Sequence, residues 1–154
     1  AMHTKHSEKV PNTLDGCYNC HPGPRTRCLR DVMSQKGMTC IDCHGSMELV
    51  AENPNPWLNE PRCDNAACHG NAYAQDQALY RFSSEHGGVY CEGCHDSPHA
   101  IAPTTQQNDA IKFIAWQGAP GPIKSCTVCH LTQPVEAGPH GMQLTSIYLP
   151  VIAR

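Results

Sequence analysis

Five short stretches decide how this chain folds, and each places two cysteines before a histidine. In chain order they are Cys17-Tyr-Asn-Cys20-His21, Cys40-Ile-Asp-Cys43-His44, Cys63-Asp-Asn-Ala-Ala-Cys68-His69, Cys91-Glu-Gly-Cys94-His95 and Cys126-Thr-Val-Cys129-His130, here called motifs 1 to 5. Motifs 1, 2, 4 and 5 share the pattern C-x-x-C-H, and motif 3 has two more residues between its cysteines. Ten of the eleven cysteines lie in these motifs, which leaves Cys28 over.

The C-x-x-C-H spacing gathers three side chains on one face of a helical turn, because residues three and four apart on a helix are neighbours. This pattern is the signature of covalent c-type haem attachment. The two thiols can bond two side groups of the porphyrin while the imidazole lies under the iron. In motif 3, the two added residues must loop out to keep this arrangement.

Cysteine-rich sequences also form zinc sites and disulfide frameworks. A zinc site of this type takes four ligands from two separated pairs. Here a histidine follows the second cysteine immediately in all five motifs. The repeated histidine therefore favours haem over zinc or disulfides.

The chain has few residues with which to build an ordinary core. Leu, Ile, Val and Phe number 24 of 154 residues, too few to offset the conformational entropy lost on folding. Haems are large apolar discs whose burial would supply the missing core. We therefore predict a single domain over residues 1–154, mostly irregular with a few short α-helices and little or no β-sheet, whose core is five covalently attached haems.

Local patterns predict short elements between the motifs. Residues 1–16 are expected to form an extended N-terminal arm, and residues 141–154 an apolar C-terminal tail. Helices are predicted at residues 26–36, 46–52, 71–84 and 105–117. In the last helix, Thr105 would be the cap, Ile111 and Ile114 would lie on the apolar stripe, and Gly118 would end it.

The five motifs make the chain resemble the multihaem c-type cytochromes, especially the electron-transfer cytochromes of anaerobic and metal-reducing bacteria. The resemblance extends from Cys17 to His130 and implies five c-type haems. The thiols implied to bind them are Cys17 and Cys20, Cys40 and Cys43, Cys63 and Cys68, Cys91 and Cys94, and Cys126 and Cys129. The implied proximal iron ligands are His21, His44, His69, His95 and His130.

Five histidines lie outside the motifs, which equals the number of distal ligands that five haems need. This matched count favours bis-histidine ligation throughout over isolated surface histidines. The predicted distal ligands are His3, His6, His86, His99 and His140. Which of them serves which haem stays open, and so does supply of a ligand by a neighbouring molecule. Methionine is the competing ligand, with Met33, Met38, Met47 and Met142 as candidates.

Cys28 is expected to be a buried side chain on the 26–36 helix, with an intermolecular disulfide or a thiol ligand as the alternatives.

An iron with two protein ligands has no position for a substrate, so its chemistry is limited to gaining or losing an electron. The expected function is therefore electron transfer between redox partner proteins or to an extracellular acceptor, and not catalysis. Three alternatives stay open: a subunit of a cytochrome filament, a module of a larger multihaem cytochrome, or a reductase with one open haem.

The charge and the apolar pattern restrict partners and location. The formal net charge is −3, and haem propionates would make it more negative, which argues against nucleic acid as a partner. The resemblance implies haem attachment outside the cytoplasmic membrane, in the periplasm or at the cell surface. No signal peptide is visible at Ala1 and no apolar run is long enough to span a bilayer. We therefore expect a mature or trimmed form of an exported protein.

Overall fold

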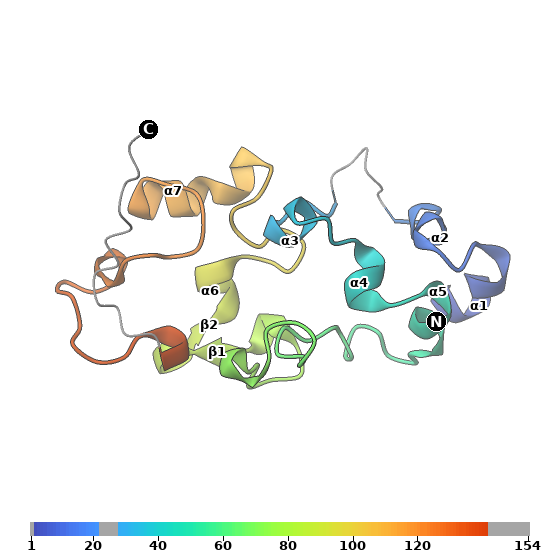
Figure 1. Cartoon of the computed structure of the whole chain (residues 1–154), viewed down its shortest axis with the longest axis horizontal. Helices are drawn as coiled ribbons and strands as arrows, with labels where there is room; N and C mark the ends of the chain where they lie inside the picture. Colours follow the sequence, from blue (N-terminus) through green and yellow to red (C-terminus); the bar gives the residue numbers. More distant parts are fainter. Residues whose placement is uncertain (1, 22–27, 142–154) are drawn as a thin grey trace.

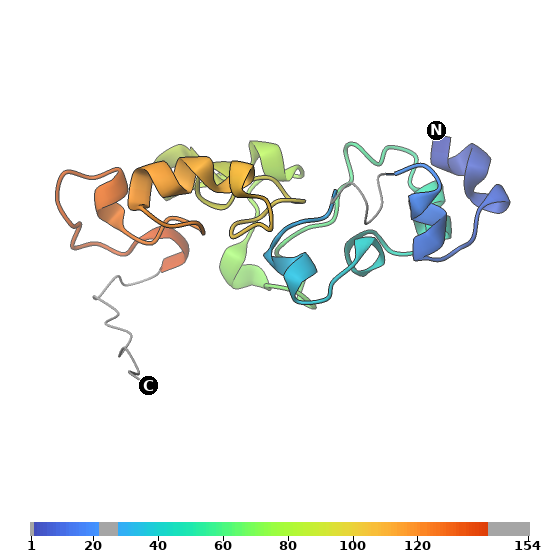
Figure 2. The same cartoon turned by 90° about the horizontal axis from the view of Figure 1, so that it is seen from above.

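Short helices and turns are spread along the long axis of the molecule, without layers (Figures 1 and 2). The computed structural model describes residues 2–21 and 28–141. In this part of the chain the longest helix has seven residues and the only sheet has two strands. The predicted irregular fold, with few short helices and little sheet, is confirmed.

The elements are short and are separated by turns. The α-helices are α1 (Met2–His6), α2 (Leu14–Tyr18), α3 (Val32–Gln35), α4 (Cys40–His44), α5 (Met47–Glu52), α6 (Cys91–His95) and α7 (Ile111–Gln117). The strands β1 (Ser84–Glu85) and β2 (Val89–Tyr90) pair antiparallel. The 3-10 turns are η1 (Ser7–Lys9), η2 (Asn71–Tyr73), η3 (Tyr80–Phe82), η4 (His86–Gly88), η5 (Gln107–Ala110), η6 (Cys126–Val128) and η7 (Pro139–Gly141).

The N-terminal segment is helical, so the predicted extended arm over residues 1–16 is wrong. Helix α1 packs against α5, and Thr4 Oγ1 donates a hydrogen bond to the carbonyl of Ala51 at 2.9 Å. A helix of five residues is not stable alone. Contact with α5, which lies beside α1 at one end of the molecule in Figure 1, therefore stabilises it.

Two helix predictions agree with the structure in part or in full. The helix over 46–52 is confirmed as α5, where the Ser46 hydroxyl accepts from the N–H of Leu49 at 3.3 Å. The helix over 26–36 is shorter than predicted, because α3 begins only after Asp31, whose carboxylate accepts from the N–H of Ser34 at 2.7 Å. Cys28 therefore precedes the helix, and it is partly exposed.

The helix predicted over 71–84 is wrong. The only helical elements there are η2 and η3, because carboxylates bind the backbone between and after them. The Asp64 carboxylate accepts from the N–H of Gln75 at 3.0 Å. The Asp76 carboxylate accepts from the N–H of Ser84 at 2.7 Å. Side-chain bonds of this kind compete with the helical hydrogen-bond pattern.

The helix predicted over 105–117 is partly confirmed. Its α-helical part is α7, which ends at Gly118 in the left-handed conformation, with φ of 76°. Thr105 does not cap it and donates its backbone N–H to the carbonyl of Arg30 at 2.8 Å. The predicted apolar stripe is wrong as a core face, because Ile111 is 58% exposed whereas Phe113 is fully buried.

The side-chain core of the described residues is small. Its buried apolar members are Met47, Ala51, Leu79, Tyr80, Ala100, Ala102, Ala110 and Phe113. Half of these are alanines, while Trp57 and Trp116 are both more than half exposed. No helix in residues 2–21 and 28–141 is long and apolar enough to cross a membrane. The predicted tail lies outside the described residues, apart from Gly141.

Candidate haem sites

The C-x-x-C-H motifs fold into single turns, as their spacing predicts. Motifs 2 and 4 are themselves the helices α4 and α6. In motif 1 the N–H of His21 donates to the carbonyl of Cys17 at 2.9 Å, and in motif 5 the N–H of His130 donates to that of Cys126 at 2.8 Å. Each histidine is thereby fixed one turn beyond its first cysteine.

Motif 3 closes the same bond over a longer loop. The N–H of His69 donates to the carbonyl of Cys63 at 3.2 Å, although two more residues lie between them than in the other motifs. The carbonyl of Asn65 accepts from the N–H groups of Cys68 and Gly70, at 2.8 and 3.1 Å. The predicted looping-out of the added residues is confirmed.

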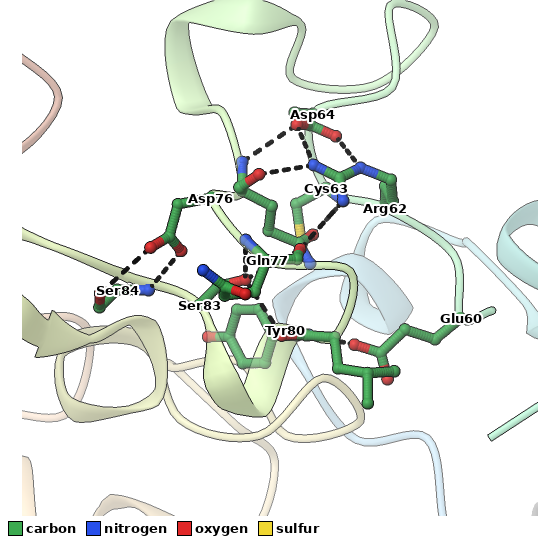
Figure 3. Close-up of polar contacts among 11 residues, drawn as sticks. Glu60, Arg62, Cys63, Asp64, Asp76, Gln77, Tyr80, Ser83 and Ser84 are labelled. Atoms are coloured by element: carbon green, nitrogen blue, oxygen red, sulfur yellow. Dashed lines mark hydrogen bonds and ion pairs between the residues drawn. The ribbon is translucent and has the colours of Figure 1, made fainter. Parts of the chain in front are cut away.

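A polar network supports motif 3 where the other motifs have a helical turn (Figure 3). Arg62 donates to the Asp64 carboxylate at 2.8 and 2.7 Å and to the carbonyls of Gln75 and Gln77 at 2.6 and 3.0 Å. The side chain of Gln75 is buried, and its Oε1 accepts from the N–H of Cys63 at 3.0 Å. Its Nε2 is buried with no partner among the described residues.

In four of the five motifs, the histidine lies beside a second imidazole. The distances between ring centres are 5.9 Å for His21 and His3, 6.2 Å for His44 and His99, 6.1 Å for His95 and His140, and 5.8 Å for His130 and His86. Because metal–nitrogen bonds to histidine are about 2.0 Å long, two imidazoles on opposite sides of one metal ion have ring centres roughly 6 Å apart. The four pairs therefore fit the two axial ligands of an iron.

The site at motif 4 is the most completely formed. Cys91, Cys94, His95 and His140 line a small, partly open pocket together with Glu85 and neighbouring residues. The Glu85 carboxylate accepts from the backbone N–H of His140 at 2.9 Å and lies 3.0 Å from its Nδ1. A proton on Nδ1 directed at this carboxylate leaves Nε2 free to bind a metal, which is the usual arrangement of ligating histidines.

Two of the histidines that complete these pairs adopt the left-handed backbone conformation. The φ angles are 43° for His86 and 58° for His140, and Gly87 and Gly141, which follow them, are left-handed too. Such conformations cost a side-chain-bearing residue about 1–3 kcal/mol and persist where the surrounding structure imposes them. Both histidines therefore lie in turns whose left-handed backbone conformation is unfavourable, and these turns position the imidazole.

At two of the four pairs, the surroundings of the motif histidine favour neutral imidazole, the form that binds metals. Although the His44 side chain is exposed, atoms packed around it lower its pKa by desolvation, and the neighbouring His99 lowers the pKa further. Desolvation also lowers the pKa of His95, and His140 adds to the effect.

Consecutive motifs are neighbours in space. Desolvation raises the pKa of the Cys40 thiol, and the nearby Cys17 raises it further. The same combination of desolvation and a thiol of another motif raises the pKa of Cys43 beside Cys68, of Cys63 beside Cys91, and of Cys94 beside Cys129. The motifs thus form a row in chain order, along which α2, α4 and α6 can be followed in Figure 1.

Two histidines, His69 and His6, are not brought beside another imidazole. The ring of His69 contacts Tyr73, with ring centres 5.8 Å apart. His6 lies in α1, where its Nδ1 is 2.8 Å from the carbonyl oxygen of Met2. All ten histidines lie in the described residues. Eight of them form the four pairs, and His69 and His6 are the remaining two. The distal role of His6 stays a prediction.

The remaining candidates add little to these sites. No disulfide joins any of the eleven cysteines, all of which lie in the described residues, and Met142 lies outside them. In residues 2–21 and 28–141, no three or more His, Cys, Asp or Glu side chains gather to hold a metal ion by themselves. The supporting roles of Glu85 and Gln75 had no signal in the sequence, because each acts on a residue distant along the chain.

No family model matches the chain, and no curated protein or solved structure is detectably similar to it.

Proposed function

We propose that this chain is a c-type cytochrome that holds five haems and transfers electrons between redox partners outside the cytoplasm. The observation that carries the proposal is the set of four imidazole pairs with ring centres 5.8 to 6.2 Å apart, each including a histidine that directly follows two cysteines. A chance meeting of histidines would not repeat one spacing at four motifs.

The residues of the chain fit the attachment of this cofactor. The thiols of each motif would hold the porphyrin covalently, and the histidine of the motif would bind the iron. When bound, haem supplies a centre that exchanges one electron at a time. The small side-chain core and the exposed tryptophans fit a protein whose core includes its cofactors.

The arrangement of the motifs fits a path for electrons along the chain. Histidines of neighbouring motifs influence one another: His21 contributes to the lowered pKa of His44, and His69 contributes to that of His95. A row of closely spaced sites, most with both axial positions taken by imidazole, favours transport of electrons over binding of a substrate. Redox proteins or an extracellular acceptor would exchange electrons with the ends of this row.

The test is to count haems and examine their ligation in protein exported by a bacterium that matures c-type cytochromes. Mass spectrometry should find five haems per chain, and the oxidised protein should show a mainly low-spin spectrum with reversible reduction. Replacing both Cys91 and Cys94 by serine should remove one haem and leave the other four. Protein that carries zinc or disulfides in place of haem would contradict the proposal.

A further inference from the structure

Motif 3 differs from the other motifs in what lies beside its histidine. The His69 ring contacts the Tyr73 ring at 5.8 Å with an angle of 70° between the planes, where the other four motifs have an imidazole. Tyr73 in turn contacts His140, with ring centres 4.9 Å apart. His140 is already paired with His95, so it is not available to His69.

The one remaining histidine lies in another part of the chain. His6 belongs to α1, which packs against α5 at the N-terminal end of the molecule (Figure 1). Motif 3 instead belongs with motif 4, because His69 and His140 contact the same tyrosine. The chain therefore has no second imidazole to place beside His69 without unpacking α1.

Motif 3 is nevertheless held firmly. The Gln75 side chain accepts from the backbone N–H of Cys63. The Asp64 carboxylate accepts from Arg62 and from the backbone N–H of Gln75, so it joins the start of the motif to the segment that follows it. Tyr73, the ring beside His69, is 45% exposed, so among the described residues this side of the motif is open to solvent. The site thus combines a fixed proximal ligand with access from outside.

We propose that the iron bound through His69 takes an external small ligand on its other side, of the class of carbon monoxide, nitric oxide or cyanide. An iron with a single imidazole keeps one coordination position that such ligands fill, whereas an iron between two imidazoles does not. This inference rests on the proposed function, because it requires haem at motif 3. It predicts that four sites of the chain only carry electrons and that one also binds a ligand.

Titration of the reduced protein with carbon monoxide tests the proposal, with absorption spectra as the readout. We expect one molecule of carbon monoxide per chain, and a high-spin signal from one of the five haems in the oxidised protein. His140→Ala serves as a positive control, because it removes the imidazole facing His95 and should raise the count to two per chain. His6→Ala should leave the count at one.

The outcomes separate this inference from the proposed function. Fewer than five haems per chain would contradict the proposed function itself. Five low-spin haems that bind no carbon monoxide would overturn only the inference. Carbon monoxide binding that appears only in His6→Ala would overturn it in favour of His6 as the second ligand, and binding that appears only in Met142→Ala would overturn it in favour of Met142.

Discussion

Motifs 3 and 4 are neighbours, yet the chain builds them by different means. Motif 4 is a regular helix, α6, and its His95 faces His140, which Glu85 holds by two contacts. Motif 3 is an irregular loop, and its His69 faces Tyr73. At motif 4 the supporting side chains orient a second imidazole, whereas at motif 3 they support the backbone that carries the cysteines.

The difference includes how the first cysteine of each motif is held. The N–H of the first cysteine has no partner within the motif in either case, as at the start of any helix. At motif 4 the N–H of Cys91 donates to the carbonyl of Ser83 at 3.0 Å, whereas at motif 3 the N–H of Cys63 donates to the side chain of Gln75. A side-chain contact therefore takes the place of a backbone contact at motif 3.

The largest expected effect comes from removing that support. Gln75→Ala leaves the N–H of Cys63 without its acceptor, and an unsatisfied buried group costs about 1–3 kcal/mol. We expect the free energy of unfolding of the haem-loaded protein to fall by about that amount, measured by denaturant titration. Gln77→Ala is the matched control, because this neighbouring side chain is exposed.

Gln75→Glu separates the hydrogen bond from the shape of the side chain, because it keeps an acceptor oxygen beside Cys63. It should lose less stability than Gln75→Ala if the bond matters most. Equal stability of Gln75→Ala and the unchanged protein would show that motif 3 does not depend on this contact, and that its haem thiols alone fix the loop.

The elements that could be predicted from the sequence are those with local causes. The turn of each motif follows from its own spacing, and α5 follows from Ser46 as the cap. The helix predicted over 71–84 failed because Asp64, which lies before the segment, and Asp76, which lies within it, bind backbone N–H groups of the segment. Periodicity does not reveal such competition.

The pairing of the histidines was likewise beyond sequence reasoning. Their number indicated that five second ligands are available, but the partner of His95 is His140, and the residue that orients His140 lies 55 positions before it. The folded chain brings four pairs together and places His6 and His69 in different parts of the molecule, so the fifth pair stays a prediction.

The second effect concerns the carboxylate at motif 4. Glu85→Gln keeps the size of the side chain but removes the negative charge beside Nδ1 of His140, which lies 3.0 Å from Glu85. The charge strengthens the imidazole as a donor to oxidised iron. We expect the reduction potential of this haem to rise by tens of mV, where about 59 mV corresponds to a tenfold change for one electron.

A redox titration followed by a spectroscopy that resolves single haems measures this shift. Glu92→Gln is the matched control, because Glu92 lies in α6 but is not among the residues that line the pocket with His140. An equal shift in both variants would mean that the overall charge, rather than the contact with His140, sets the potential.

The smallest effect is the pH dependence of motif 3. Hydrogen bonds from Arg62 and from the backbone N–H of Gln75 lower the pKa of Asp64. A carboxyl whose pKa is lowered in the folded state stabilises the fold above its ordinary pKa of about 3.9, and this contribution disappears as the pH falls through the lower folded value. Asp64→Asn lacks the titrating group and hence this contribution at every pH.

Denaturant titrations of both proteins between about pH 6 and pH 2 measure the difference, from which the groups that the two proteins share cancel. We expect the unchanged protein to be more stable than Asp64→Asn above the ordinary carboxyl pKa, with the difference closing below it. Motif 4 provides the contrast: Glu92→Gln should not reproduce this pH dependence, because in the described part of the chain no arginine binds Glu92 as Arg62 binds Asp64. A difference that stays constant down to the lowest pH would show that the substitution Asp64→Asn disturbs the loop by its shape, and that the network of motif 3 does not depend on charge.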